Sequence, residues 1–241
     1  MIKVILCEGK TDAILLSYYL EKVSGWKYSK KMPKNFTIKP DSDNQSVNCY
    51  IKDSDQLLIC AVGGKDGFEK FYQDKLSSPI LDSNVINRLA IIIDRDDNGI
   101  KSIEKRFSES LNPVISKMKN NKWIQNTYKD SYQLDQQIET LLVVVPQEYQ
   151  GALENVMLDS ISEDPYDEVI VNKTGEFVKE MRAIASKYIY NNRTELKAHL
   201  GVTWAIQYPE KVFSLIDEQI RSVAWEKSDI LKKCFECLKE I

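Results

Sequence analysis

Residues 2–12 read IKVILCEGKTD, and residues 89–96 read LAIIIDRD. Residues 2–7 and 89–93 are short, mostly apolar runs of aliphatic and β-branched residues, and an acidic residue directly follows each run. Such runs are typical of strands that are buried on both faces, as in a parallel sheet covered by helices. The two stretches therefore predict an α/β fold in which carboxylates follow directly after buried strands.

Strand and helix patterns alternate along most of the remaining chain. Further strands are predicted at 47–52, 57–62 and 138–145, and helices at 11–22, 65–76, 99–119 and 149–160. This alternation predicts a mainly parallel sheet sandwiched by helices.

The pattern also predicts two parts of the chain. Residues 1–172 are expected to form the α/β domain, with an inserted hairpin or loop at about 25–55. Residues 173–241 follow an almost entirely helical pattern and are expected to form a C-terminal extension.

Composition narrows the class of protein. The chain has 241 residues, a net charge of −3 and 43% hydrophobic residues, which is typical of a folded globular protein. Five cysteines without a disulfide-like spacing predict reduced thiols and a cytoplasmic protein. We expect neither a signal peptide nor a membrane span. The single histidine, His199, excludes zinc sites built from two or three imidazoles, so carboxylates are the better candidates for catalysis.

Acidic residues gather where the predicted strands end. Glu8 follows the first strand, and Asp94 and Asp96 follow the strand at 89–93. In an open parallel sheet the ligand site lies outside the carboxyl ends of the strands, so these side chains are expected to lie close together. Adjacent carboxylates repel unless a cation neutralises them, and Mg²⁺ prefers oxygen ligands. The sequence therefore predicts a divalent-metal site, with Mg²⁺ as the cofactor and Mn²⁺ as a substitute.

These residues carry a resemblance to a known family. Glu8-Gly9 after the first strand and Asp94-Arg95-Asp96 after a later one resemble the paired motifs of the Toprim domain. Asp12, four positions beyond Glu8, resembles the pattern of OLD-type Toprim nucleases and of ribonuclease M5. The resemblance covers roughly residues 1–172, and implies a Toprim-like sheet and metal-dependent hydrolysis of phosphodiester bonds.

The resemblance also implies roles for individual residues. Asp94 and Asp96 would hold one metal together with Glu8, which is also the candidate general acid/base. Asp12 and Glu154 would help to hold a second metal. Lys65, after the glycine turn Gly63-Gly64, or Lys187 further on would stabilise developing negative charge.

Three functions follow from this interpretation. The first is an OLD-type DNA nuclease that acts in defence against foreign DNA. The second is a ribonuclease M5-like nuclease that processes RNA. The third is a non-catalytic Toprim-fold module that works with a separate ATPase, because Gly9-Lys10-Thr11 lacks the earlier glycine of a phosphate-binding loop and the chain has no ATPase module of its own. DNA is favoured over RNA as the partner.

Two further features concern partners. A lysine-rich patch lies between residues 22 and 39, where Trp26, Tyr28 and Phe36 are interleaved with the lysines. Lysines neutralise phosphates and aromatic rings stack on bases, so the patch is a candidate nucleic-acid surface, with a solvated loop as the alternative. The helical C-terminal segment carries an apolar stripe that packs on the core and leaves room for a homodimer interface.

Overall fold

A seven-stranded mixed sheet forms the centre of the computed structural model, which describes residues 1–34 and 36–241. The strand order is β2-β3-β4-β1-β5-β7-β6. The four inner strands run parallel, and antiparallel strands lie at both edges. The strands are β1 (Ile2–Cys7), β2 (Lys27–Ser29), β3 (Ser46–Lys52), β4 (Asp55–Ala61), β5 (Ile86–Asp94), β6 (Ile124–Lys129) and β7 (Asp135–Val145).

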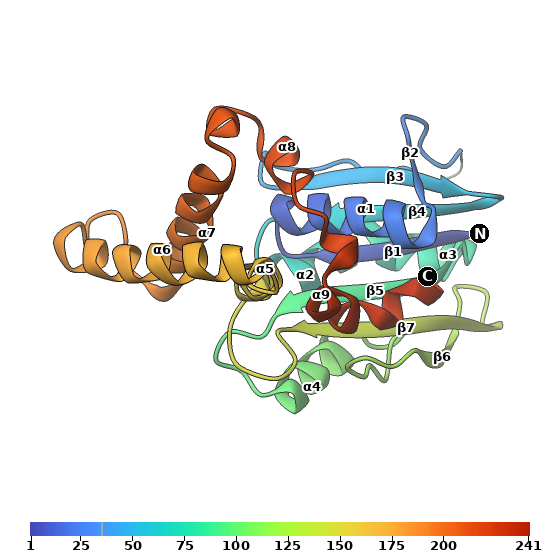
Figure 1. Cartoon of the computed structure of the whole chain (residues 1–241). Helices are drawn as coiled ribbons and strands as arrows, with labels where there is room; N and C mark the ends of the chain where they lie inside the picture. Colours follow the sequence, from blue (N-terminus) through green and yellow to red (C-terminus); the bar gives the residue numbers. More distant parts are fainter. Residues whose placement is uncertain (35) are drawn as a thin grey trace.

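Helices cover both faces of this sheet (Figure 1). A π-helical segment at Tyr72–Ser77 joins two of them, and single helical turns lie at Pro209–Lys211, Trp225–Lys227 and Glu236–Glu240. The α-helices are α1 (Lys10–Ser24), α2 (Gly67–Phe71), α3 (Ser78–Ser83), α4 (Ile100–Ser110), α5 (Leu153–Ile161), α6 (Pro165–Ile184), α7 (Asn192–Gln207), α8 (Ile216–Ile220) and α9 (Asp229–Cys234). The prediction of an α/β fold with a mainly parallel sheet between helices is confirmed at this level.

The inner strands are apolar over their C-terminal parts, where each of their faces meets a different core. Along β1, Ile5 packs into a cluster with α1, α5 and the C-terminal segment. Its neighbour Leu6 faces the opposite cluster, where Phe68 of α2 and Phe107 of α4 lie. Successive side chains of a strand point to opposite faces, so a strand buried on both sides requires an unbroken apolar run.

The predicted insertion extends the sheet at one edge. Within residues 25–55, β2 and β3 pair in antiparallel register and β3 continues the sheet onto β4. Residue 35 lies in this segment and outside the described residues. Trp26 and Phe36 are buried in the two cores, so the prediction that these rings are available for stacking on bases is wrong; Tyr28 remains exposed. Aromatic side chains among lysines are drawn into the core by their large apolar area.

The last residues of the chain return to the sheet. Trp225 and Phe235 are fully buried, and the Phe235 ring meets the Tyr19 ring of α1 at a centroid distance of 5.5 Å. The domain boundary predicted after residue 172 falls inside the continuous helix α6. Figure 1 shows α6 and α7 projecting from the side toward which β5 and β7 point. The C-terminal segment is thus an arm, formed by α6 and α7, followed by a segment that completes the core.

No helix in the described part of the chain is long and apolar enough to cross a membrane.

Candidate functional site

The carboxyl ends of the parallel strands bring the predicted acidic residues to one edge of the sheet. Cys7 pairs with Ile92 across β1 and β5, so Glu8 and Asp94 leave neighbouring strands at nearly the same level. Gly67 shapes the adjacent turn after β4. A Cβ atom at this position would lie 2.5 Å from the carbonyl oxygen of Val62, so only glycine allows the turn to close so tightly.

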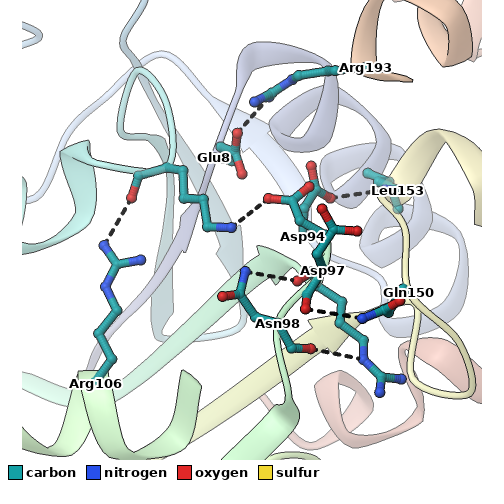
Figure 2. Close-up of polar contacts among 11 residues, drawn as sticks. Glu8, Asp94, Asp97, Asn98, Arg106, Gln150, Leu153 and Arg193 are labelled. Carbon is teal, nitrogen blue, oxygen red and sulfur yellow. Dashed lines mark hydrogen bonds and ion pairs between the residues drawn. The ribbon is translucent and has the colours of Figure 1, made fainter. Parts of the chain in front are cut away.

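Glu8 is the most deeply buried of these acidic residues. Its side chain is 2% exposed, and its Oε1 accepts a hydrogen bond of 2.5 Å from the Nη2 of Arg193 (Figure 2). Its second oxygen, Oε2, is buried and has no hydrogen-bond partner among the described residues. A buried carboxylate oxygen without a partner is costly, and in native structures it commonly marks an ion, a water molecule or a reacting group.

Asp94 lies beside Glu8 with one oxygen engaged. It is 7% exposed, and its Oδ1 accepts a hydrogen bond of 2.9 Å from the backbone N–H of Leu153 at the start of α5. This bond gives Asp94 a structural role at the helix start. Burial, and then the neighbouring charges of Asp12 and Glu8, raise the pKa of Asp94 well above its ordinary value.

Asp12 and Glu154 complete a group of four interacting carboxylates. Asp12 lies in the first turn of α1, and its Oδ2 accepts a hydrogen bond of 2.8 Å from the N–H of Gly9. Burial, opposed by that hydrogen bond and reinforced by the charges of Glu154 and Glu8, raises the pKa of Asp12 to about 7. Glu154 lies in the first turn of α5, and its charge acts on Asp12 and Asp94. We call Glu8, Asp12, Asp94 and Glu154 the carboxylate cluster.

Asp96 has other partners than the residues of this cluster. Its backbone has a positive φ of 47° and forms a two-way hydrogen-bonded bridge with Gly151. The Asp96 Oδ2 accepts a hydrogen bond of 2.5 Å from the Nζ of Lys65. The structure therefore groups Asp94 with Glu8, Asp12 and Glu154, and pairs Asp96 with Lys65. The assignment of Asp94, Asp96 and Glu8 to one metal stays a prediction.

The two predicted lysines have different positions. Lys65 is partly buried in the turn after β4, next to the site, and its carbonyl oxygen accepts a hydrogen bond of 3.2 Å from Arg106. Lys187 is exposed in the turn after α6, where its Nζ lies 5.3 Å from the centroid of the Tyr188 ring. No contact joins Lys187 to the carboxylate cluster in the part of the chain that the structure describes.

The carboxylate oxygens of the cluster are suitable ligands for a divalent cation, although basic side chains of the protein already pair with some of the acidic residues at this edge. Across residues 1–34 and 36–241, no three Asp, Glu, Cys or His side chains already converge as a metal-binding group. Arg193 engages Glu8, and Lys65 engages Asp96. The buried, unpaired Oε2 of Glu8 and the raised pKa values of Asp12 and Asp94 indicate that negative charge is still under-compensated. Glu8 and Asp94, with Asp12 and Glu154, are the residues that would hold a cation.

Comparison with known proteins places the chain in a family. The sequence model of a family described as "Protein of unknown function (DUF3226)" matches residues 2–240. The chain belongs to the DUF3226 family. None of the curated proteins matches the chain. A hypothetical protein, PH0156 from Pyrococcus horikoshii OT3, is similar in structure, with a TM-score of 0.47 and 18% identity over 98% of this chain and 99% of that chain.

Arg193 is the site residue of this DUF3226 chain that sequence reasoning missed. It lies 185 positions from Glu8 along the chain, and only the fold of the arm brings the two together. One signal was present in the sequence. Asn191 is a typical helix N-cap, so Arg193 lies in the first turn of α7, where the helix dipole disfavours a positive charge. The carboxylate of Glu8 offsets that cost here.

Neutralising Asp94 is expected to stabilise the metal-free protein. In Asp94→Asn, the amide oxygen can keep the hydrogen bond from Leu153, while repulsion within the carboxylate cluster falls. We expect the free energy of unfolding in EDTA to rise by roughly 0.5–2 kcal/mol, as at other sites where function holds like charges together. Urea denaturation of the wild type and of Asp94→Asn in EDTA measures the difference in the free energy of unfolding.

Asp130 provides a control of opposite sign. Its carboxylate accepts hydrogen bonds from the N–H groups of Tyr132 and Leu134 and from the side chain of Gln136. These bonds, chiefly the one from Leu134, lower the pKa of Asp130. Asp130→Asn should therefore lower stability under the same conditions. A loss of stability in Asp94→Asn comparable to that in Asp130→Asn would show that Asp94 is a structural cap alone.

Proposed function

We propose that this DUF3226 protein is a metal-dependent nuclease that hydrolyses phosphodiester bonds, as the Toprim-like, OLD-type interpretation of its sequence implies, with DNA as its substrate. The observation that carries the proposal is the buried Oε2 of Glu8, which has no partner among the described residues and lies within a cluster of four interacting carboxylates. The cluster lies at the carboxyl edge of the parallel strands, which is where open α/β sheets bind ligands.

The chemistry of the cluster supports hydrolysis of a phosphate ester. Hard oxygen ligands favour Mg²⁺, with Mn²⁺ as a substitute, and such a cation neutralises the phosphate and activates water. Glu8 offers one oxygen for this role and is the candidate general acid/base. Asp94 holds its position through the hydrogen bond from Leu153, which leaves its second oxygen for the site. Lys65, which is paired with Asp96, is placed to stabilise negative charge near the loop after β5.

One observation favours a second candidate, the non-catalytic module that works with a partner ATPase. Arg193 and Lys65 already neutralise one carboxylate each, and the described residues contain no preformed metal-binding group. A binding module would keep these ion pairs permanently, whereas in a nuclease the pair at Glu8 would open once a cation neutralised that carboxylate.

A cleavage assay separates these functions. Purified protein would be incubated with supercoiled plasmid and, separately, with structured RNA, in Mg²⁺, Mn²⁺ or EDTA. Plasmid nicking that requires metal and is lost in a Glu8→Gln/Asp94→Asn double variant supports the DNA nuclease. Cleavage of RNA alone would favour the ribonuclease M5-like alternative. No cleavage of either substrate would overturn the proposal and favour the binding module.

A further inference from the structure

We propose that Arg193 and the first turn of α7 form a phosphate-binding subsite next to the carboxylate cluster, which holds the backbone of the nucleic-acid strand. This inference rests on the proposed function, since it names the group that positions the substrate of the same site. It assigns to the C-terminal arm a role that the Toprim-like part of the sequence does not supply.

A cavity lies where the arm meets the sheet. Its volume is about 330 Å³, and it lies between the loop after β5, the loop before α5 and the start of α7. Its charged lining residues are Asp96, Asp97, Arg193 and Glu195, of which Asp96 pairs with Lys65 and Glu195 pairs with Arg182. Arg193 also contacts Glu8 (Figure 2), so this side chain joins the cavity to the carboxylate cluster. A phosphodiester group in this cavity would therefore contact an arginine that reaches the residues proposed to cleave it.

The guanidinium of Arg193 has donors to spare. It donates to Glu8 through Nη2 alone, and its side chain is 49% exposed. An arginine carries five N–H donors in a planar fork that matches two oxygens of a phosphate. No other described residue accepts a hydrogen bond from this guanidinium, so most of its donors are available to a ligand in the cavity.

The helix that carries Arg193 adds further donors. The Asn191 side chain caps α7 by accepting a hydrogen bond of 2.8 Å from the N–H of Thr194. The backbone N–H groups of Asn192 and Arg193 have no acceptor elsewhere in the described chain. Free N–H groups at the positive end of a helix favour an anion. The ion pair with the buried Glu8 holds the guanidinium of Arg193 beside the carboxylate cluster.

Contacts within the arm hold this helix start in place. The Thr174 and Thr203 hydroxyls form a buried hydrogen bond of 2.8 Å between α6 and α7. The His199 ring nitrogen Nε2 lies 2.8 Å from the carbonyl oxygen of Val171, and the ring packs against Gly175. These contacts account for His199 as a structural residue, and they fix the direction from which Arg193 reaches the site.

The ion pair with Glu8 has a further consequence. If Glu8 held a cation, its charge would be neutralised there, and Arg193 could donate both arms of its fork to a phosphate. Arg193 would then hold the phosphate on the side of the cavity while the carboxylates hold the cation. The same arginine thus stabilises the cluster before the substrate binds and contacts the substrate afterwards.

Binding measurements with Arg193→Gln test the subsite. The probe is a short, fluorescein-labelled single-stranded oligodeoxynucleotide, titrated by fluorescence anisotropy in Ca²⁺ to suppress cleavage, with inorganic phosphate as a competitor. We expect Arg193→Gln to bind about 10- to 100-fold more weakly, as for loss of a charge-assisted contact, and Arg193→Lys to be intermediate. Arg221→Gln is the matched control, because Arg221 is 42% exposed and pairs with Glu21 of α1 and with Asp217, one turn earlier in α8.

The binding and cleavage results test the phosphate subsite and the nuclease activity independently. Equal binding by wild type and Arg193→Gln, or an equal loss in Arg221→Gln, would overturn the subsite, and plasmid nicking by the wild type would still stand. Arg193-dependent binding without cleavage by the wild type would support the subsite and overturn the nuclease. Binding that is lost in Arg193→Gln but restored in part by Arg193→Lys shows that the effect is not a failure to fold.

Discussion

Glu8→Gln is expected to lower the rate of metal-dependent cleavage by about 10³-fold or more, the range seen when a group that acts on the transition state is removed. Glutamine has nearly the same shape as glutamate and can still accept the hydrogen bond from Arg193, so the fold should be preserved. It is a much poorer ligand for a divalent cation and cannot act as a general base. The effect should therefore appear in kcat and in the metal dependence, measured from initial rates of plasmid nicking.

Glu104→Gln is the control for this experiment. The Glu104 side chain is also largely buried, and its carboxylate accepts hydrogen bonds from Lys119 and from the N–H of Asn120, away from the carboxylate cluster. It should change the cleavage rate by less than about threefold, as for substitutions outside the site. If Glu8→Gln cleaved as fast as Glu104→Gln, Glu8 would have no part in catalysis.

Trp225→Ala is expected to lower the free energy of unfolding by about 3–5 kcal/mol, the usual range for truncating a buried tryptophan. Trp225 is fully buried against α1 and the sheet, and its Nε1 donates a hydrogen bond of 2.7 Å to the carbonyl oxygen of Ile220. Alanine would leave a cavity and remove one of the two hydrogen bonds that the Ile220 carbonyl oxygen accepts, the other coming from the N–H of Val223. Urea denaturation followed by circular dichroism measures the change.

Phe213→Ala tests the same segment at an exposed position. Phe213 is 100% exposed, so its loss should change stability by less than about 0.5 kcal/mol. The contrast between the two variants shows whether residues after the arm complete the core. Equal, small effects in both variants would mean that the C-terminal segment does not dock on α1 in solution.

The buried strands were the most predictable part of the fold. The apolar runs of β1, β5 and β7 predict buried strands directly, because a strand covered on both faces needs such a run. The edge strand β6 was missed: its sequence, IQNTYK, is mostly polar, and it gains its place by pairing with β7. The helix predicted to reach residue 119 ends at Ser110, since the residue before Pro113 is disfavoured in a helix.

Some residues of the candidate site could likewise be predicted from the sequence, and others could not. Glu8 and Asp94 were predictable because strand ends meet at one edge, and local sequence fixes where each strand ends. The pairing of Asp96 with Lys65 was not, because it joins the loop after β5 to the turn after β4. Arg193 depends on the path of the whole arm. The proposed basic residue Lys187 shares that arm, but it lies in a turn that faces solvent.

The most direct test of the account is to locate a bound metal. Crystals of the protein soaked in Mn²⁺ would be measured for anomalous scattering at a wavelength where manganese contributes strongly. The account predicts a peak in contact with carboxylate oxygens of Glu8 and Asp94, with the Arg193 side chain moved off Glu8, and no such peak in Glu8→Gln crystals. An intact Arg193–Glu8 ion pair with no peak at the carboxylate cluster would contradict it.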